Sequence, residues 1–168
     1  MPASAEPLLL DTSAAVPLMV ADHPAHEEVL SRVAGQALGL SGHAAFETYS
    51  VLTRLPPPVR RSPPTVSRLL ALNFPETRFL PVQAHLRLLR KLADLGIAGG
   101  SVYDALVGMA ATYHSLTLAT RDERALAIDH ISSSPMPSAP GFRRATACPL
   151  PRCVSWVGAT SIRAVLAV

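Results

Sequence analysis

Short apolar runs alternate along the chain with stretches of helical periodicity, and this alternation predicts an α/β fold. The runs at residues 7–10, 37–41, 78–82 and 116–120 have the length and composition of buried strands. Between them, apolar positions recur every three or four residues, as in amphipathic helices. We expect helices near residues 25–33, 43–55, 65–72, 84–95 and 101–113, and one through Val16 and Leu18. Strands and helices that alternate in this way are typical of a parallel sheet of four strands flanked by helices.

Prolines and glycines mark the ends of these elements. Pro56, Pro57 and Pro58 end the helix before them, because proline cannot donate the helical hydrogen bond and disfavours helix in the preceding residue. From Ser132 onward the chain reads SSSPMPSAPGFRRATACPLPRC, without acidic residues or sustained periodicity. We therefore expect one domain at residues 1–131 and a Pro-, Ser- and Arg-rich, poorly ordered tail at residues 132–168.

Composition excludes several classes of protein. With 49% hydrophobic and 16% charged residues, the chain is not disordered throughout, and its length is that of one domain. No apolar run approaches the roughly 20 residues of a membrane-spanning helix. The first residues carry Glu6 and Asp11 where a signal peptide would carry positive charge. We expect a cytoplasmic protein that does not contact membranes.

The basic isoelectric point of about 9.3 originates in the tail. Residues 1–131 contain 11 of the 15 Lys and Arg and all 12 Asp and Glu, so this part is nearly neutral. A neutral domain with only 5% aromatic residues is not typical of a pure nucleic-acid-binding module. Four arginines are candidates for holding an RNA backbone, although a solvated surface explains them equally well: Arg60, Arg61, Arg68 and Arg121.

Two acidic residues directly follow predicted strands. Asp11 comes after residues 7–10, and Asp122 after residues 116–120. Because parallel strands of one sheet end at the same edge, both side chains should lie in the crevice at that edge. Helix capping is the alternative for both, since Asp11 begins Asp-Thr-Ser and Thr120 stands three residues before Glu123.

Two further acids lie on helices that we expect to be buried. Glu47 shares a helical face with three residues expected in the core, namely Ala44, Val51 and Leu55. A buried carboxylate needs a partner, so an ion pair with Arg54 or Arg87 is the alternative for Glu47. Asp104 is the only charged residue between Ser101 and Tyr113, and Ser101-x-x-Asp104 also has the spacing of a capping box.

Four acids near one edge of one sheet indicate a cation site. Crowded carboxylates repel one another unless a cation neutralises them. An all-oxygen set suits Mg²⁺ or Mn²⁺ better than zinc. Such ions bind phosphate oxygens and activate water, so phosphodiester hydrolysis is the chemistry that this pattern favours.

The residues around the acids resemble a known family. LLLDTSA, Glu47, GGSVYDALVGMAA and LTLATRDERAL, in this order and spacing over about residues 8–130, are similar to PIN domains and most closely to VapC toxins. The resemblance implies a three-layer fold and a metal-dependent endoribonuclease with Mg²⁺ or Mn²⁺. It further implies an RNA substrate, a homodimer, and an antitoxin that inserts a peptide near the acidic site.

The resemblance also assigns roles to single residues. It implies that the metal is bound by Asp11, Glu47, Asp104 and Asp122. It implies that hydroxyl groups behind them place water or the metal, and these belong to Thr12, Ser13 and Thr120.

The chain departs from the family after residue 131. Relatives continue into a fifth, apolar edge strand, whereas here the proline-rich tail follows, so the expected sheet of four strands would lack the fifth. A catalytically inactive or decayed PIN-like domain that acts only as a binding partner is therefore the alternative. Haloacid-dehalogenase-like phosphatases and phospho-receivers fit less well, because the first expects Asp-x-Asp at position 11 and the second needs a late lysine, whereas the only lysine is Lys91.

Overall fold

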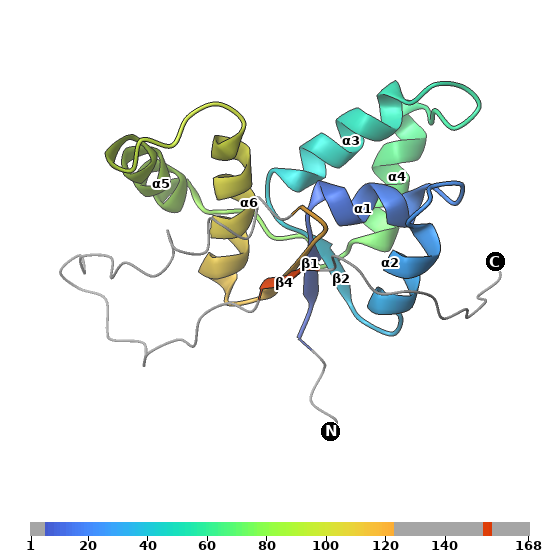
Figure 1. The fold of residues 1–168 in the computed structure, drawn as a ribbon, viewed down its shortest axis with the longest axis horizontal. Coiled ribbons are helices and arrows are strands. Elements are labelled where there is room, and N and C mark those ends of the chain that lie inside the picture. Colours follow the sequence, from blue (N-terminus) through green and yellow to red (C-terminus); the bar gives the residue numbers. More distant parts are fainter. Residues whose placement is uncertain (1–5, 123–152, 156–168) are drawn as a thin grey trace.

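A parallel sheet with the strand order β2-β1-β3-β4 forms the centre of the structure (Figure 1). The computed structural model describes residues 6–122 and 153–155. The strands are β1 (Leu8–Leu10), β2 (Leu38–Leu40), β3 (Thr117–Thr120) and β4 (Cys153–Ser155). Leu9 of β1 pairs with Gly39 on one side and with Leu118 on the other, so β1 is an internal strand. Asp11 therefore leaves the sheet at its middle.

Helices cover both faces of the sheet, as a three-layer fold requires. Leu8 and Leu10 pack into a core with Val29, Val33 and Phe74, whereas Leu9 faces a second core that contains Val107. Alternate residues of β1 thus point into opposite layers. Figure 1 shows α5 and α6 on one side and α1 to α4 on the other. The helices are α1 (Thr12–Met19), α2 (His26–Val33), α3 (Ala44–Arg54), α4 (Pro63–Asn73), α5 (Val82–Asp94) and α6 (Ser101–His114).

Every predicted helix and three of the four predicted strands are confirmed. The strand expected at residues 78–82 is wrong, because only the single bridge between Ser41 and Arg78 forms there. The segment does lie along β2, since the backbone N–H of Arg78 donates to the carbonyl of Leu40. However, the N–H of Leu40 donates to the hydroxyl of Thr77 instead of a backbone carbonyl, and Pro81, which has no N–H, follows. The ladder therefore ends after one bridge.

Strand β4 comes from the part of the chain that the sequence predicts to be a tail. It pairs with β3 in parallel, with Ala119 opposite Val154 and Thr120 opposite Ser155. Strand β3 is therefore internal at the point where Thr120 approaches the site. Apart from residues 153–155, the predicted tail lies outside the described residues, and the division of the chain at residue 131 stays a prediction.

Within residues 6–122 and 153–155, no helix has both the length and the apolar character needed to cross a membrane.

Candidate active site

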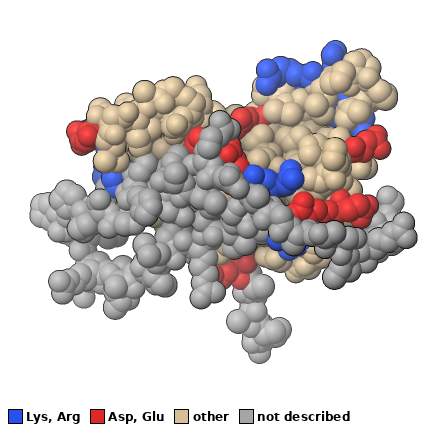
Figure 2. Space-filling model, viewed as in Figure 1, with Lys and Arg blue, Asp and Glu red and all other residues tan. Residues whose placement is uncertain are grey.

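A cavity of about 230 Å³ opens beyond the carboxyl ends of β1 and β3. All four acids singled out from the sequence line it, together with Thr12 and Ser13 at the start of α1. They come from four separate segments, since Asp11 follows β1, Glu47 lies on α3, Asp104 on α6 and Asp122 after β3. In Figure 2, acidic side chains gather where α6 meets the half of the molecule that contains α1 and α3.

Asp11 is buried at the base of this cavity, with 8% of its surface exposed. One carboxylate oxygen accepts a hydrogen bond from the backbone N–H of Ala14, so Asp11 caps α1, as one of the sequence interpretations predicts. The hydroxyl of Ser13 donates to the same carboxylate at 2.8 Å, and that of Thr120 donates at 2.6 Å. Asp11 can therefore cap α1 and line the cavity at the same time.

Two hydroxyl groups connect the end of β3 to the start of α1. The backbone N–H of Arg121 donates to the hydroxyl of Ser13 at 2.7 Å, and that of Asp122 donates to the hydroxyl of Thr120 at 3.0 Å. Each hydroxyl also donates to Asp11. Ser13 and Thr120 thereby fix the backbone that carries Asp122 relative to Asp11.

Glu47 lines the cavity from an exposed position, which corrects the sequence interpretation that placed it on a buried face. The buried residues of α3 are Ala44, Thr48 and Leu52, so the helix is rotated relative to the predicted face and Glu47 lies beside the core stripe. Its partner is the hydroxyl of Thr12, which donates to the carboxylate at 2.7 Å. The alternative ion pair with Arg54 or Arg87 is not formed.

Asp104 is half-buried in the first turn of α6 and lines the cavity. The predicted capping box with Ser101 does not form, because Gly100 is the residue that precedes the helix and no side chain caps it. Ala105 and Val107, which flank this part of α6, are buried in the core. The packing of α6 thereby carries Asp104 to the cavity.

Burial dominates the electrostatics of Asp11 and raises the pKa of its carboxyl above the ordinary value. Hydrogen bonds from Thr120, Ser13 and the Ala14 backbone oppose this rise in pKa, whereas the negative charge of Asp122 adds to it. Asp11 and Asp122 are thus close enough for their charges to interact, and the burial of Asp11 limits screening by water.

We expect Asp11→Asn to stabilise the protein at neutral pH when no divalent cation is added. An acid whose pKa is raised by folding binds more protons in the folded state, so the free energy of unfolding falls as pH rises through the raised pKa. Asparagine removes the charge and still caps α1. Thermal unfolding in a chelator should show a higher midpoint for Asp11→Asn at pH 7, and the difference should shrink below the ordinary pKa of 3.8. A less stable variant at pH 7 would show that the hydrogen bonds outweigh the burial of the charge.

The donor groups of the cavity suit a hard divalent cation. They are carboxylate and hydroxyl oxygens, the ligands that Mg²⁺ and Mn²⁺ prefer, and a cation would relieve the cost of burying charge at Asp11. Among the described residues, no three His, Cys, Asp or Glu side chains lie close enough to hold an ion together. The donor types fit the metal, and the acids share one cavity with room between them.

The four arginines proposed to contact RNA lie outside the cavity lining. Arg60 and Arg61 are exposed in the turn between α3 and α4, where each side chain donates to a nearby backbone carbonyl. Arg68 is exposed on α4. Arg121 points toward α2, with a guanidinium nitrogen 3.9 Å from a carboxylate oxygen of Glu28. A role in RNA binding stays a prediction for all four.

Sequence reasoning did not single out Tyr103, which also lines the cavity. Its side chain is 52% exposed and its ring stacks on that of His43, with centroids 4.7 Å apart. The only sequence signal was its place directly before Asp104 in GGSVYDALVGMAA.

Residues 8–131 match the family model of the PIN domain. The chain belongs to the PIN domain family. This PIN-domain chain is 49% identical over 119 residues to ribonuclease VapC27 of Mycobacterium tuberculosis, an alignment that covers 71% of this chain and 87% of the relative. It is 42% identical over 118 residues to ribonuclease VapC40 of the same species, with 69% of this chain and 87% of the relative covered. The predicted similarity to VapC-type PIN domains is confirmed.

The fold of this PIN domain also resembles that of a chain in the crystal structure of VapBC2 from Rickettsia felis bound to a DNA fragment from its promoter. The TM-score is 0.55 over 89% of this chain and 98% of that chain. At 13% sequence identity, the likeness supports the PIN fold alone.

Proposed function

We propose that this protein is an endoribonuclease that depends on Mg²⁺ or Mn²⁺ and acts as the toxin of a VapBC-like toxin–antitoxin pair. The observation that carries the proposal is the convergence of Asp11, Glu47, Asp104 and Asp122 on one cavity. Four separate segments supply these acids, and Asp11 caps α1 in addition to lining the cavity. An acidic, all-oxygen cavity is suited to binding divalent cations for phosphodiester hydrolysis.

The relatives support RNA as the substrate. VapC27 and VapC40 are named ribonucleases, and each aligns with more than two thirds of this chain at 42% identity or more. RNA hydrolysis adds the oxygen of water to phosphorus, breaks the bond to one ribose oxygen and protonates that oxygen.

The chain's own residues divide this work between holding and orienting. Asp11, Glu47, Asp104 and Asp122 would hold the cation, which when bound supplies charge for the phosphate oxygens and lowers the pKa of water. Thr120 and Ser13 fix the carboxylate of Asp11 by hydrogen bonds, and Thr12 fixes that of Glu47. Because these three hydroxyls donate to the acids, the carboxylates keep their orientation before substrate arrives.

The alternative of an inactive or decayed domain is not favoured. All four acids are present and line the same cavity. The sheet edge beside β3 is paired with β4, so the edge that the sequence predicts to be incomplete carries a strand. The described part of the chain therefore lacks the unpaired β3 edge that would have supported a decayed domain.

Cleavage of purified RNA by the full chain tests the proposal directly. We expect cutting with Mg²⁺ or Mn²⁺, loss of cutting with excess chelator, and its return when the metal is restored. Several RNAs, among them a transfer RNA pool and ribosomal RNA, should be tried because the cleavage site is unknown. If the folded protein binds no metal in calorimetry and cuts none of these RNAs, the proposed function is wrong.

Metal binding should also stabilise the folded protein. At a free metal concentration of about 100 times Kd, binding adds about 2.7 kcal/mol to the free energy of unfolding. This corresponds to a rise in Tm of roughly 5–20 °C for a domain of this size. We expect Mn²⁺ to raise the Tm of the wild type and to have a smaller effect on Asp122→Asn. Equal shifts in both proteins would place the metal outside the cavity.

We further propose that the protein is cytoplasmic, with a cognate antitoxin as its partner and a homodimer as its assembly. The partner and the assembly follow from the VapC-type resemblance, and an antitoxin segment near the cavity would block access to the acids. Co-purification with the antitoxin should suppress RNA cleavage, and light scattering of the free protein should give twice the mass of 17.8 kDa. A monomer at micromolar concentration would contradict the dimer.

A further inference from the structure

Tyr103 is the aromatic residue on the rim of the acid cavity. It lies on α6 next to Asp104, lines the cavity, and has 52% of its surface exposed. A single exposed tyrosine is common on protein surfaces, so Tyr103 is distinguished by its place at the cavity and by its neighbours. The neighbouring acids explain the cavity, but they do not explain an exposed ring beside it.

His43 holds this ring in place. The two rings are stacked, with centroids 4.7 Å apart and planes 17° apart. His43 directly precedes α3 and has a fixed backbone because the carbonyl of Ser41 and that of His43 accept hydrogen bonds from the first turn of α3. A ring that is covered on one face and still half exposed presents its other face and its edge at low cost in conformational entropy.

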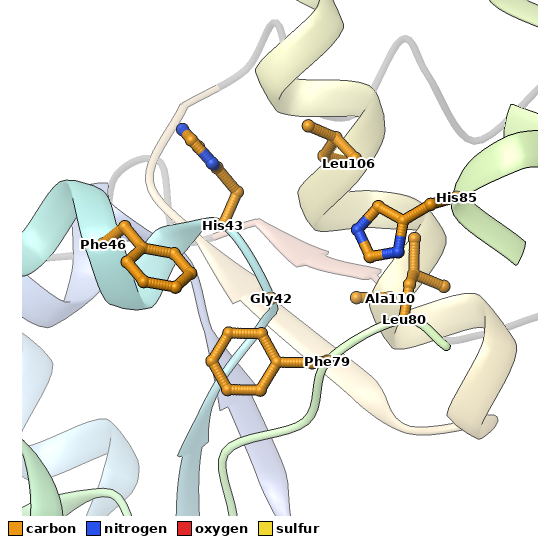
Figure 3. A pocket seen from close by; sticks show the side chains of 8 residues that line it. All are labelled: Gly42, His43, Phe46, Phe79, Leu80, His85, Leu106 and Ala110. Atoms are coloured by element: carbon orange, nitrogen blue, oxygen red, sulfur yellow. The ribbon is translucent and has the colours of Figure 1, made fainter. Parts of the chain in front are cut away.

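Ring-bearing side chains continue from Tyr103 into a second pocket. His43 lines a pocket of about 70 Å³ with Phe46, Phe79 and His85. Figure 3 shows Phe46 and Phe79 around this pocket, with His43 at one end pointing away from Phe79. Among the described residues, four Phe or Tyr side chains are exposed, and three of them line one of these two cavities: Phe46, Phe79 and Tyr103. The stacked pair of His43 and Tyr103 thus lies between the aromatic pocket and the acid cavity.

The described lining of the two cavities offers aromatic rings to a nucleic acid. Among the described residues that line either cavity there is no lysine or arginine. The acid cavity repels phosphate unless a cation is bound, so an RNA strand gains little from direct ion pairs there. Every base has an aromatic face, and a base stacked on an aromatic side chain is held without reading its sequence.

We propose that Tyr103, supported by His43, stacks against an unpaired base of the RNA next to the phosphate that is cut. The inference rests on the proposed ribonuclease function and deepens it, because it names a residue that positions the nucleotide beside the acids. Tyr103 is a positioning residue in this proposal. Its ring holds the nucleotide beside the acids of the cavity, among them Asp104 in the same turn of α6 and Asp11 directly after β1.

Steady-state cleavage by three variants of the full chain tests the role of the ring. We expect Tyr103→Leu to raise KM for single-stranded RNA about tenfold, the order of one lost base–aromatic stack, with kcat within about twofold. Tyr103→Phe keeps the ring and should match the wild type within about twofold. Tyr113→Leu is the matched control, since Tyr113 is 48% exposed on the same helix but lines neither cavity. Circular dichroism establishes that each variant is folded.

A second measurement alters the RNA as well as the protein. Single abasic sites are moved along an RNA oligonucleotide that carries one mapped cut. When Tyr103 is present, one abasic position beside the cut should weaken binding about tenfold, and the same position should cost Tyr103→Leu little. Both proteins also carry Asp11→Asn, so that the RNA stays intact and the result does not depend on catalysis.

The outcomes separate this inference from the proposed function. Metal-dependent cleavage that is unchanged in Tyr103→Leu, or an abasic effect that is equal in both proteins, overturns the stacking proposal and leaves the nuclease intact. A loss in Tyr103→Leu that Tyr103→Phe shares would assign the effect to the hydroxyl group and also overturn it. A protein that neither cuts nor binds any RNA overturns both.

Discussion

Replacing Asp11 by asparagine is expected to reduce metal-dependent RNA cleavage by a factor on the order of 10²–10³ or more. The stabilisation that a bound cation gives to the transition state is several kcal/mol, and each 1.4 kcal/mol is a factor of ten in rate. Asparagine has nearly the same shape and still accepts the hydrogen bond from Ala14, so the fold should survive. Single-turnover cleavage with saturating protein measures the chemical step.

Asp94→Asn is the matched control for this experiment. Asp94 is an exposed aspartate at the end of α5 that does not line the cavity, and its substitution should leave the rate within about twofold. Asp104→Asn and Asp122→Asn should behave as Asp11→Asn does. If Asp11→Asn is folded and cuts RNA at the wild-type rate, the cavity is not the active site.

Gly39→Ala is expected to lower the free energy of unfolding by about 3 kcal/mol, the upper part of the usual range for overpacking. A Cβ atom on Gly39 would lie 2.2 Å from the carbonyl oxygen of Glu76 and 2.8 Å from the backbone nitrogen of Thr77. These are backbone atoms that cannot rotate away, and the N–H of Glu76 donates to Leu38 beside them. The segment after α4 would have to leave β2. Urea unfolding followed by circular dichroism measures the loss.

Gly108→Ala provides the opposite case in the same protein. Gly108 lies within α6, and nothing is within 4 Å of an added Cβ atom. Alanine in a helix interior is favoured over glycine by roughly 0.5–1 kcal/mol, so this variant should be more stable than the wild type. Equal losses in both glycine variants would mean that packing against residues 76–77 does not matter.

The sequence predicts the elements well where hydrophobicity alone decides them. Apolar runs before Asp11 and before Asp122 are strands, and the prolines after Leu55 mark the end of α3. Because both strands are parallel, their ends meet, and the prediction that Asp11 and Asp122 share one edge is confirmed by the cavity. The order of the strands, β2-β1-β3-β4, could not be predicted in this way, because the handedness of crossover connections restricts the possible orders without selecting one.

The rotation of α3 could not be predicted, because its apolar pattern is ambiguous. Phe46 is 65% exposed, whereas the polar Thr48 is fully buried. The small side chains of Ala44 and Thr48 are buried and set the rotation of α3. Hydrophobicity scales give such residues little weight. Glu47 still lines the cavity, but as an exposed carboxylate oriented by Thr12 instead of a buried one.

Two other features depend on contacts between distant segments. The failure of residues 78–82 to form a strand follows from the hydroxyl of Thr77, which takes the place of a backbone acceptor for Leu40. A low aromatic content likewise argued against base stacking, yet the exposed rings of Phe46, Phe79 and Tyr103 are gathered at one place. Composition counts residues and does not place them.

Strand β4 makes the order of synthesis matter for this protein. Residues 8–131, which match the family and contain all four acids, are translated before residues 153–155. Until then β3 ends the sheet with unpaired N–H and C=O groups, the kind of edge that adds a strand from another chain. A product truncated before residue 153 would therefore have every acid in place and an open edge at β3, beside Thr120. For such a product we expect self-association, so the pairing of β3 with β4 protects the solubility of the protein.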